Sequence, residues 1–94
     1  MQVTLITCTF NSENTINDCC NSILIQTHKN IEHIIIDNNS QDNTLNFVKK
    51  FKIQNQRIIY QKSNGLYSAL NEGLKASNGN IIGVLHSDDT FNNE

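Results

Sequence analysis

The chain has 94 residues and a mass of 10.6 kDa, which is enough for one small domain. Its formal net charge is −2 and no segment clusters lysine and arginine, so a nucleic-acid surface made of basic residues is not expected. Sixteen asparagines supply polarity without charge, while thirteen isoleucines are enough for a compact core. Disorder is therefore not expected.

Neither a membrane segment nor a secretory leader is expected. No apolar run approaches the roughly 20 residues of a membrane span, and the first residues lack a basic leader. Cys8, Cys19 and Cys20 form an odd set without a C-x-x-C motif, so no zinc framework is predicted. Reduced thiols of this kind indicate a cytoplasmic protein.

The first half of the chain alternates between strand and helix periods. A β-branched run from Val3 to Thr9 predicts a strand, and the run 34–36 predicts a second strand buried on both sides, as in the middle of a parallel sheet. Between them a helix is expected, with Asn11 or Ser12 as its cap. Its apolar face recurs at helical spacing in Ile16, Cys19, Cys20, Ile23 and Leu24.

The second half repeats this alternation. A helix capped by Asp42 is expected to carry Leu45, Phe47, Val48 and Phe51, and residues 58–60 form a third strand. A third helix, carrying Leu66, Ala69, Leu70 and Leu74, is expected to end with a C-cap at Asn78-Gly79. Residues 81–85 complete the pattern as a fourth strand. The predicted fold is α/β, a Rossmann-like parallel sheet of about four strands with three helices.

Ligands of open parallel sheets bind beyond the carboxyl ends of the strands, so the four segments that follow the predicted strands are the candidate site. These segments, rich in Asn, Ser or Thr, are Cys8–Glu13, Asp37–Asp42, Gln61–Gly65 and His86–Asp89. All but Gln61–Gly65 contain carboxylates. Neither a G-x-G-x-x-G turn nor a P-loop is present, which argues against dinucleotide binding and P-loop chemistry. By itself the pair Asp88-Asp89 fits either a solvated turn or a site for Mg²⁺ or Mn²⁺.

Many residues in one order and spacing resemble the N-terminal, nucleotide-sugar-binding part of family 2 glycosyltransferases, which have the GT-A fold. The resemblance spans nearly the whole chain and rests on Thr9-Phe10-Asn11 with Glu13, Ser22-Ile23-Leu24 with Gln26-Thr27, Glu32 before Ile34–Ser40 with Asp42 and Thr44, Gly65-Leu66-Tyr67, Ala69, Asn71, Gly73-Leu74, Ala76, Gly79, and Asp88-Asp89.

The resemblance implies a role for each matching position. The nucleotide-sugar would be bound by Thr9, Phe10, Glu13, Asp37, Asn38 and Asp88. A divalent ion, Mn²⁺ or Mg²⁺, would be held by Asp89 with Asp88. The implied reaction is an inverting sugar transfer from a nucleotide-sugar donor, such as a UDP-sugar, in bacterial surface polysaccharide synthesis.

The sequence also departs from the family pattern. Asn38 stands where many relatives carry a second Asp that pairs with uracil, and His86 stands where a third Asp is often found. The larger departure is length, because members of the family continue well beyond the acidic motif with the half that supplies the acceptor site and the base. Residues 1–94 are therefore expected to form one donor domain that stops after the acidic motif, without the acceptor half or the catalytic base. No catalytic residue is assigned, and self-association of the exposed sheet is expected. The alternative hypothesis is a non-catalytic α/β module that binds a nucleotide or a partner.

Overall fold

Strands and helices alternate along the chain in the computed structural model, which describes residues 2–25, 30–62 and 65–88. In chain order the elements are β1 (Val3–Thr9), α1 (Ile16–Leu24), β2 (Ile31–Asp37), α2 (Thr44–Lys50), β3 (Gln56–Tyr60), α3 (Leu66–Ala76) and β4 (Ile81–Val84). This is the predicted succession. None of the helices in the described part of the chain has the length and apolar character needed to cross a membrane.

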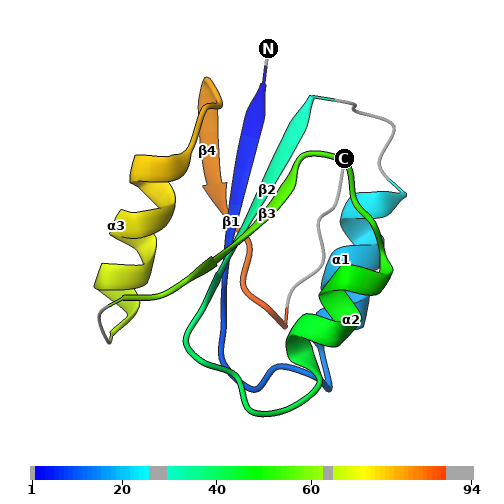
Figure 1. Cartoon of the computed structure of the whole chain (residues 1–94). Coiled ribbons are helices and arrows are strands. Elements are labelled where there is room, and N and C mark those ends of the chain that lie inside the picture. Colours follow the sequence, from blue (N-terminus) through cyan, green and yellow to red (C-terminus); the bar gives the residue numbers. More distant parts are fainter. Residues whose placement is uncertain (1, 26–29, 63–64, 89–94) are drawn as a thin grey trace.

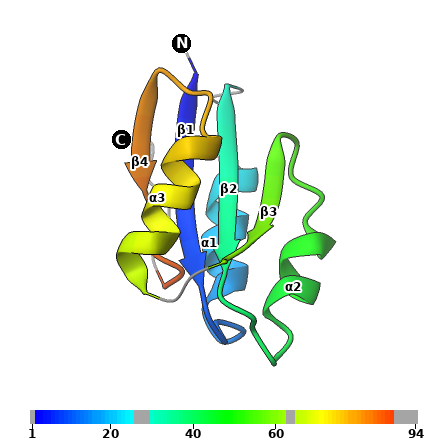
Figure 2. The same cartoon turned by 60° about the vertical axis from the view of Figure 1, so that its left-hand side comes forward.

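The four strands form one parallel sheet in the order β3-β2-β1-β4 (Figure 2). Strand β1 pairs with β2 from Val3↔Ile31 to Thr9↔Asp37, so these two strands end at the same level. Strand β4 pairs with the first part of β1, up to Ile6↔Val84. The prediction of a parallel α/β sheet with four strands and three helices is confirmed.

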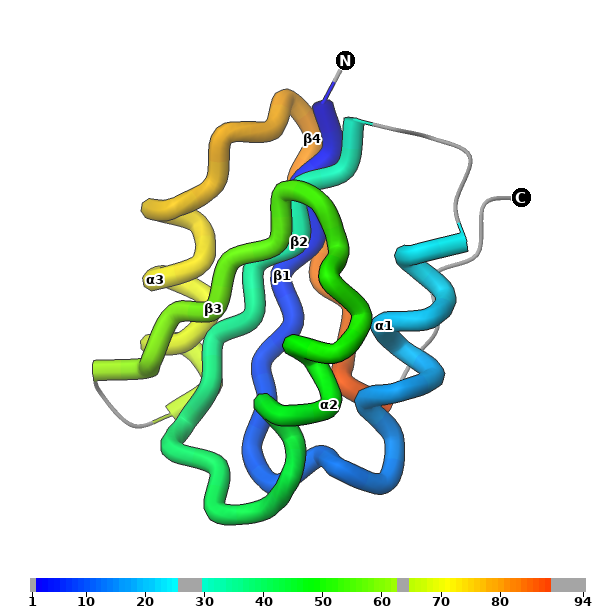
Figure 3. The backbone as a smooth tube through the Cα atoms, turned by 45° about the vertical axis from the view of Figure 1, so that its right-hand side comes forward, coloured from blue at the N-terminus to red at the C-terminus, as the bar shows by residue number. Residues whose placement is uncertain are grey.

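Helices cover both faces of the sheet, with α1 and α2 on one side and α3 on the other (Figures 1 and 3). The core beneath α1 and α2 includes buried residues of both helices and of β1 and β2: Leu5, Ile16, Cys19, Cys20, Ile23, Ile31, Ile35 and Val48. The core beneath α3 contains Ile6, Ile34, Ile36 and Ala69. Every residue of β2 is buried, as its apolar run predicts.

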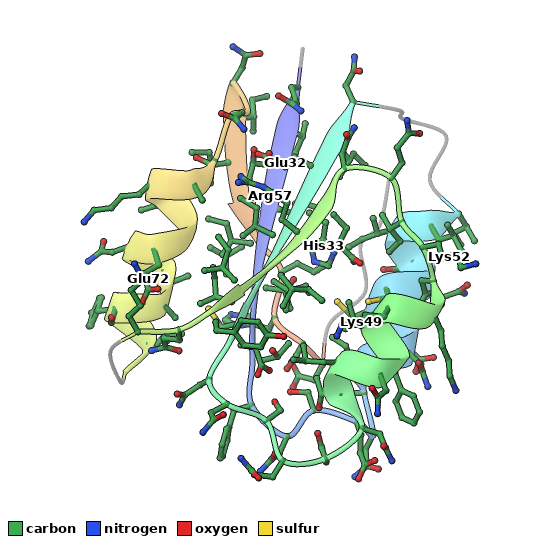
Figure 4. All side chains as sticks on the ribbon, viewed as in Figure 1. Glu32, His33, Lys49, Lys52, Arg57 and Glu72 are labelled. Atoms are coloured by element: carbon green, nitrogen blue, oxygen red, sulfur yellow. The ribbon has the colours of Figure 1, made fainter. Side chains whose placement is uncertain are left out.

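Strand β2 also carries a histidine inside the protein. His33 is fully buried, with its Nε2 2.8 Å from Thr7 Oγ1 and its Nδ1 3.0 Å from Gln56 Nε2 (Figure 4). Burial disfavours the charged imidazolium and lowers the pKa of His33 to about 4. Both partners are uncharged, so the ring is accommodated in its neutral form.

A second buried polar group lies at the amino edge of the sheet. The Glu32 carboxylate accepts hydrogen bonds from Thr4 Oγ1 (2.8 Å), Asn78 N–H (2.9 Å) and Asn78 Nδ2 (3.1 Å), and it pairs with Arg57 at 3.3 Å (Figure 4). Burial raises the pKa of Glu32, but the hydrogen bonds from Asn78 and Thr4 and the Arg57 charge outweigh it and lower the pKa below its usual value. Glu32 thereby joins β1, β2, β3 and the segment before β4.

The expected helix ends were partly wrong. Neither Asn11 nor Ser12 caps α1: the cap position is Thr15, without a side-chain cap bond. Asn43 occupies the cap position of α2, yet Asp42 Oδ1 accepts the Thr44 N–H at 3.0 Å, which is the bond expected of it. Helix α3 ends at Ala76 and is followed by an extended residue, so Gly79 is not a C-cap. The Gly79 N–H instead donates to Thr4 Oγ1 at 2.8 Å.

Candidate functional site

The loops that follow β1 and β2 lie side by side beyond the carboxyl ends of the strands (Figure 1). Asn11 joins them, since its N–H donates to Ser40 Oγ at 3.0 Å and its Oδ1 accepts the Gln41 N–H at 2.8 Å. Asn11 adopts a φ of 48°, a left-handed conformation that Asn tolerates better than most residues. These contacts bring the first two predicted segments of the site together.

Asp37, at the end of β2, is buried and hydrogen-bonded through both carboxylate oxygens. Its Oδ1 accepts from Thr9 Oγ1 and from Ser40 Oγ, each at 2.6 Å, and its Oδ2 accepts the Ser40 N–H at 2.9 Å. It is 1% exposed. Asp37 therefore holds the end of β1 against the loop after β2.

Asp42 holds the segment before α1 against the start of α2. Its Oδ2 accepts the Glu13 N–H at 3.2 Å, and its Oδ1 accepts from both the Thr44 N–H and the Thr44 hydroxyl. The Thr44 hydroxyl in turn accepts the Ser12 N–H at 2.7 Å. Glu13 Oε2 accepts from Asn43 Nδ2 at 3.2 Å, so the Glu13 side chain turns toward α2.

These contacts set the electrostatics of the loops. Desolvation raises the pKa of Asp42, but the hydrogen bonds from Thr44 and Glu13 lower it more, and the net pKa lies below the usual value. Partial burial raises the pKa of Cys8, at the end of β1, so its thiol stays protonated at neutral pH. The edge is thus acidic and lacks a reactive thiolate.

A hollow of about 190 Å³ opens beside these loops, between the ends of β1 and β2 and the start of α3. It is lined by Cys8, Thr9, Phe10, Asn38, Gln61, Gly65, Leu66 and Ala69. Phe10 is 59% exposed although it is a large aromatic residue. Three of the predicted nucleotide-binding residues, Thr9, Phe10 and Asn38, thus share one cavity wall, whereas Glu13 and Asp37 lie outside the lining.

The loop after β4 reaches the same edge. Leu85 N–H donates to Ile6 O at 3.0 Å, and the hydroxyls of Ser12 and Ser87 lie 3.1 Å apart. Asp88 is exposed in the turn that follows, and the expected metal ligand Asp89 lies outside the described residues. Within residues 2–25, 30–62 and 65–88, no three His, Cys, Asp or Glu side chains are grouped so that they could hold a metal ion.

Several residues that shape this edge were not singled out from the sequence as organisers of the loops. They are Asn11, Ser12, Ser40, Thr44 and Ser87, all with short polar side chains that bond to a neighbouring loop. The available signal was the density of Asn, Ser and Thr after each strand. That density marks loops, but it does not say which loop each hydroxyl or amide will reach.

The hollow lies at the carboxyl edge of the parallel sheet, the place where open α/β folds bind their ligands. The family model described as glycosyl transferase family 2 matches residues 4–94, and the chain belongs to this family. The solved structures that it resembles have the GT-A fold, so the resemblance seen in the sequence is confirmed.

Among the curated relatives, the Escherichia coli UDP-Glc:alpha-D-GlcNAc-diphosphoundecaprenol beta-1,3-glucosyltransferase WfaP is 41% identical over 90 residues, which cover 93% of this chain and 35% of WfaP. The crystal structure of Staphylococcus aureus TarS in complex with UDP superimposes with a TM-score of 0.90 at 30% identity, covering 100% of this chain and 29% of that one.

A more distant structure, the Pyrobaculum calidifontis mannosyltransferase PcManGT in complex with GDP-Man and Mn²⁺, shares the fold with a TM-score of 0.84 at 23% identity. It covers 96% of this chain and 28% of that one. The chain spans between 13% and 35% of the length of such curated relatives as the Streptococcus pneumoniae protein GlyA and WfaP.

Proposed function

We propose that residues 1–94 form a donor-binding domain of a glycosyltransferase that transfers a sugar from a nucleotide-sugar, with UDP as the carrier nucleotide. The observation that supports this most is the shared hollow of Thr9, Phe10 and Asn38 at the carboxyl edge of the sheet. In parallel α/β folds this edge is where ligands bind. The UDP complex of TarS, a protein of similar fold, supports the choice of nucleotide.

The lining of the hollow suits a nucleoside. The exposed Phe10 ring offers a flat apolar surface for a base, and the Asn38 amide can both donate and accept hydrogen bonds along the edge of that base. The Thr9 hydroxyl already donates to Asp37, so Thr9 would contact the ligand through its backbone. At about 190 Å³ the hollow is smaller than the roughly 300–1,000 Å³ of complete ligand sites, so it would hold one part of the donor.

Asp37 and Glu13 take supporting roles in this proposal. Both oxygens of Asp37 are occupied by Thr9 and Ser40, so it would act by fixing the wall on which the base lies. Glu13 faces Asn43 and adds negative charge beside the hollow. The contribution of both residues to nucleotide binding would be indirect.

The charge of the edge favours a divalent cation. The segments 10–15, 38–43 and 85–88 contain Glu13, Asp42 and Asp88 but no lysine or arginine, and the fourth segment of the edge, 61–65, carries one lysine, Lys62. A diphosphate placed between the first three segments would be repelled by their carboxylates. Carboxylate oxygens of Asp88 and Asp89 are the hard ligands that Mg²⁺ and Mn²⁺ prefer. When bound, the cation would neutralise the charge that develops on the departing diphosphate.

We propose an inverting displacement for the complete enzyme. An acceptor hydroxyl oxygen forms a bond to the anomeric carbon as the bond from that carbon to the diphosphate oxygen breaks, and the acceptor proton passes to a base. No residue of this chain is assigned as that base. The acceptor site and the base would lie in the part of the relatives that extends beyond the length of this chain. The reduced thiols fit a cytoplasmic place of synthesis for surface polysaccharides.

Titration calorimetry of UDP with and without Mn²⁺ tests this proposal. Asp89→Ala is expected to weaken Mn²⁺-dependent binding about tenfold or more. Residues that only hydrogen-bond to a metal ligand already contribute about 10- to 100-fold to metal affinity, and a ligand itself contributes at least as much. Asp88→Ala is expected to have a smaller effect. Asp18→Asn removes one charge from an exposed position of α1 and is the matched control, expected to bind as the wild type does.

Binding of UDP that needs no Mn²⁺ and is insensitive to both aspartates would contradict the metal assignment. Absence of any UDP binding would instead favour the alternative of a partner-binding module. Nucleotide binding without sugar transfer, in a chain extended to the length of its relatives, would favour a non-catalytic nucleotide-binding module.

A further inference from the structure

Two serines connect the first and last loops of the described edge. The hydroxyl oxygens of Ser12 and Ser87 lie 3.1 Å apart, although the residues are 75 positions apart in the chain. Both residues are half-buried. We refer to Ser12 and Ser87 as the serine pair.

The backbone of Ser12 is fixed independently of its hydroxyl. Its N–H donates to Thr44 Oγ1 at 2.7 Å, and its carbonyl accepts from the N–H groups of Thr15 (3.1 Å) and Ile16 (2.9 Å). The hydroxyl also accepts the Phe10 N–H at 3.3 Å. Replacing this hydroxyl therefore leaves the frame of the loop in place and removes its links to Phe10 and Ser87.

The loop after β4 depends more on the serine pair. In its described part, residues 85–88, the hydrogen bonds that reach back to β1 and its loop are Leu85 N–H to Ile6 O and the contact of Ser87 with Ser12. Asp88 follows directly and is exposed. The position of Ser87 thus limits where the Asp88 carboxylate can lie relative to Phe10 in the wall of the hollow.

We propose that Ser12 and Ser87 are positioning residues of the donor site, which hold the Asp88 turn at a fixed place beside the nucleotide wall. The inference rests on the proposed function. A nucleotide bound with a cation must contact the Phe10 wall and the acidic turn together, so its affinity depends on their relative position. A nucleotide bound without the cation contacts the wall alone and does not depend on Ser87.

Calorimetry on the variants Ser12→Ala and Ser87→Ala, and on the double variant, tests the inference with UDP as the probe. Ser87→Ala, which removes the contact between the two hydroxyls, is expected to bind UDP about threefold to tenfold more weakly in the presence of Mn²⁺, the range of one neutral hydrogen bond, and unchanged in its absence. Ser12→Ala also loses its bond to Phe10 and is expected to bind at least as weakly with Mn²⁺. The double variant is expected to bind no more weakly than Ser12→Ala, because both single variants remove the same contact between hydroxyls. Ser77→Ala, which removes a hydroxyl bonded to Leu74 O at the end of α3, is the matched control.

Additive losses in the double variant, or equal losses of Ser87→Ala with and without Mn²⁺, would overturn the inference. Amide hydrogen exchange of Leu85, whose N–H donates to Ile6 O at the start of this loop, gives a readout that needs no ligand. Its exchange is expected to be faster in Ser12→Ala than in Ser77→Ala. If the wild-type chain binds no UDP, the proposed function fails, and the exchange measurement still decides the inference. Unchanged exchange at Leu85 would then overturn it.

Discussion

At the scale of single residues, buried carboxylates arrange the loops of the candidate site. Asp37 accepts three hydrogen bonds, from the Thr9 hydroxyl and from the hydroxyl and N–H of Ser40. All three partner groups are hydrogen-bond donors, so both terminal atoms of the residue 37 side chain must be acceptors. This requirement, more than the charge itself, makes Asp37 hard to replace.

Asp37→Asn is expected to lower the free energy of unfolding by about 2 kcal/mol. The NH₂ group of Asn would face the donors of Thr9 or Ser40 and could not accept from them, and each hydrogen bond to a charged group contributes about 1.5–3 kcal/mol. Urea denaturation measures the change. Asp18→Asn, at an exposed position of α1, is the matched control and should change stability by less than about 1 kcal/mol. Equal effects of the two substitutions would contradict the role of Asp37.

His33 makes stability depend on pH. Its folded pKa of about 4 lies below the usual value of 6.5, so the unfolded chain binds more protons between these pH values. Its contribution to stability is complete above pH 6.5 and is lost as the pH falls toward 4, by about 3 kcal/mol in all. Denaturation of the wild type at pH 7 and pH 5 should show about 2 kcal/mol of this loss, and His33→Gln should reduce it.

The matched control for His33 is His86→Gln, which replaces an exposed imidazole and is expected to keep the wild-type dependence. A wild-type stability that is the same at pH 7 and pH 5 would contradict the prediction.

The candidate site could be predicted from the sequence only in part, and residues show why. Thr9, Phe10 and Asn38 follow strands and could be placed at the edge from the apolar pattern alone. The bonds of Asp37 could not, because a pattern gives the position of a carboxylate along the chain but not the donors that tertiary structure brings to it. The same holds for Asn11, expected as a cap and found as a bridge between loops.

At the scale of elements, the start of β4 is fitted closely against the start of β1. A Cβ added at Gly79 would lie 2.7 Å from Thr4 N and 3.1 Å from Gln2 O, and these are backbone atoms that cannot turn away. A Cβ at Gly83, within β4, would meet the Leu5 side chain at 3.3 Å, and that side chain can adjust. Close approach therefore explains Gly79 where a helix cap was expected.

Gly79→Ala is expected to lower the free energy of unfolding by about 1–3 kcal/mol through this overlap. Gly83→Ala is the matched control, with an expected change below about 1 kcal/mol. Thermal or urea unfolding of both variants measures the difference. A Gly79 variant as stable as the wild type would show that the segment before β4 can move away from β1.

The succession of elements was predictable because apolar residues recur with period 2 in strands and about 3.6 in helices. The order β3-β2-β1-β4 was not, since periodicity describes the faces of each strand and carries no information about its neighbours. Only β2, apolar on both faces, indicated by its sequence that it lies inside the sheet.

At the scale of the whole molecule, β4 forms one edge of the described sheet. Ile81, Ile82 and Val84 are 47%, 42% and 50% exposed, which is unusual for consecutive apolar residues of a strand. An apolar edge strand with unpaired backbone groups is a template for pairing with another chain. The 94-residue chain is therefore expected to self-associate as its concentration rises.

Sedimentation velocity at increasing protein concentration tests this expectation. Ile82→Lys should shift the chain toward the monomer, because a charged side chain on an edge strand opposes pairing. Tyr67→Lys introduces the same charge at an exposed position of α3 and is the matched control, expected to associate as the wild type does. A wild type that stays monomeric throughout would contradict the prediction.

Glu32 and its partners Thr4, Asn78 and Arg57 lie at the amino edge of the sheet, and the hollow lies at the opposite edge. The contacts that tie the strands together at one end are therefore separate in space from the loops that would meet a ligand. Sequence changes in those loops can accumulate without loosening the far end of the sheet. The same scaffold could in this way exchange its loops for others, and acquire a new ligand preference while keeping its architecture.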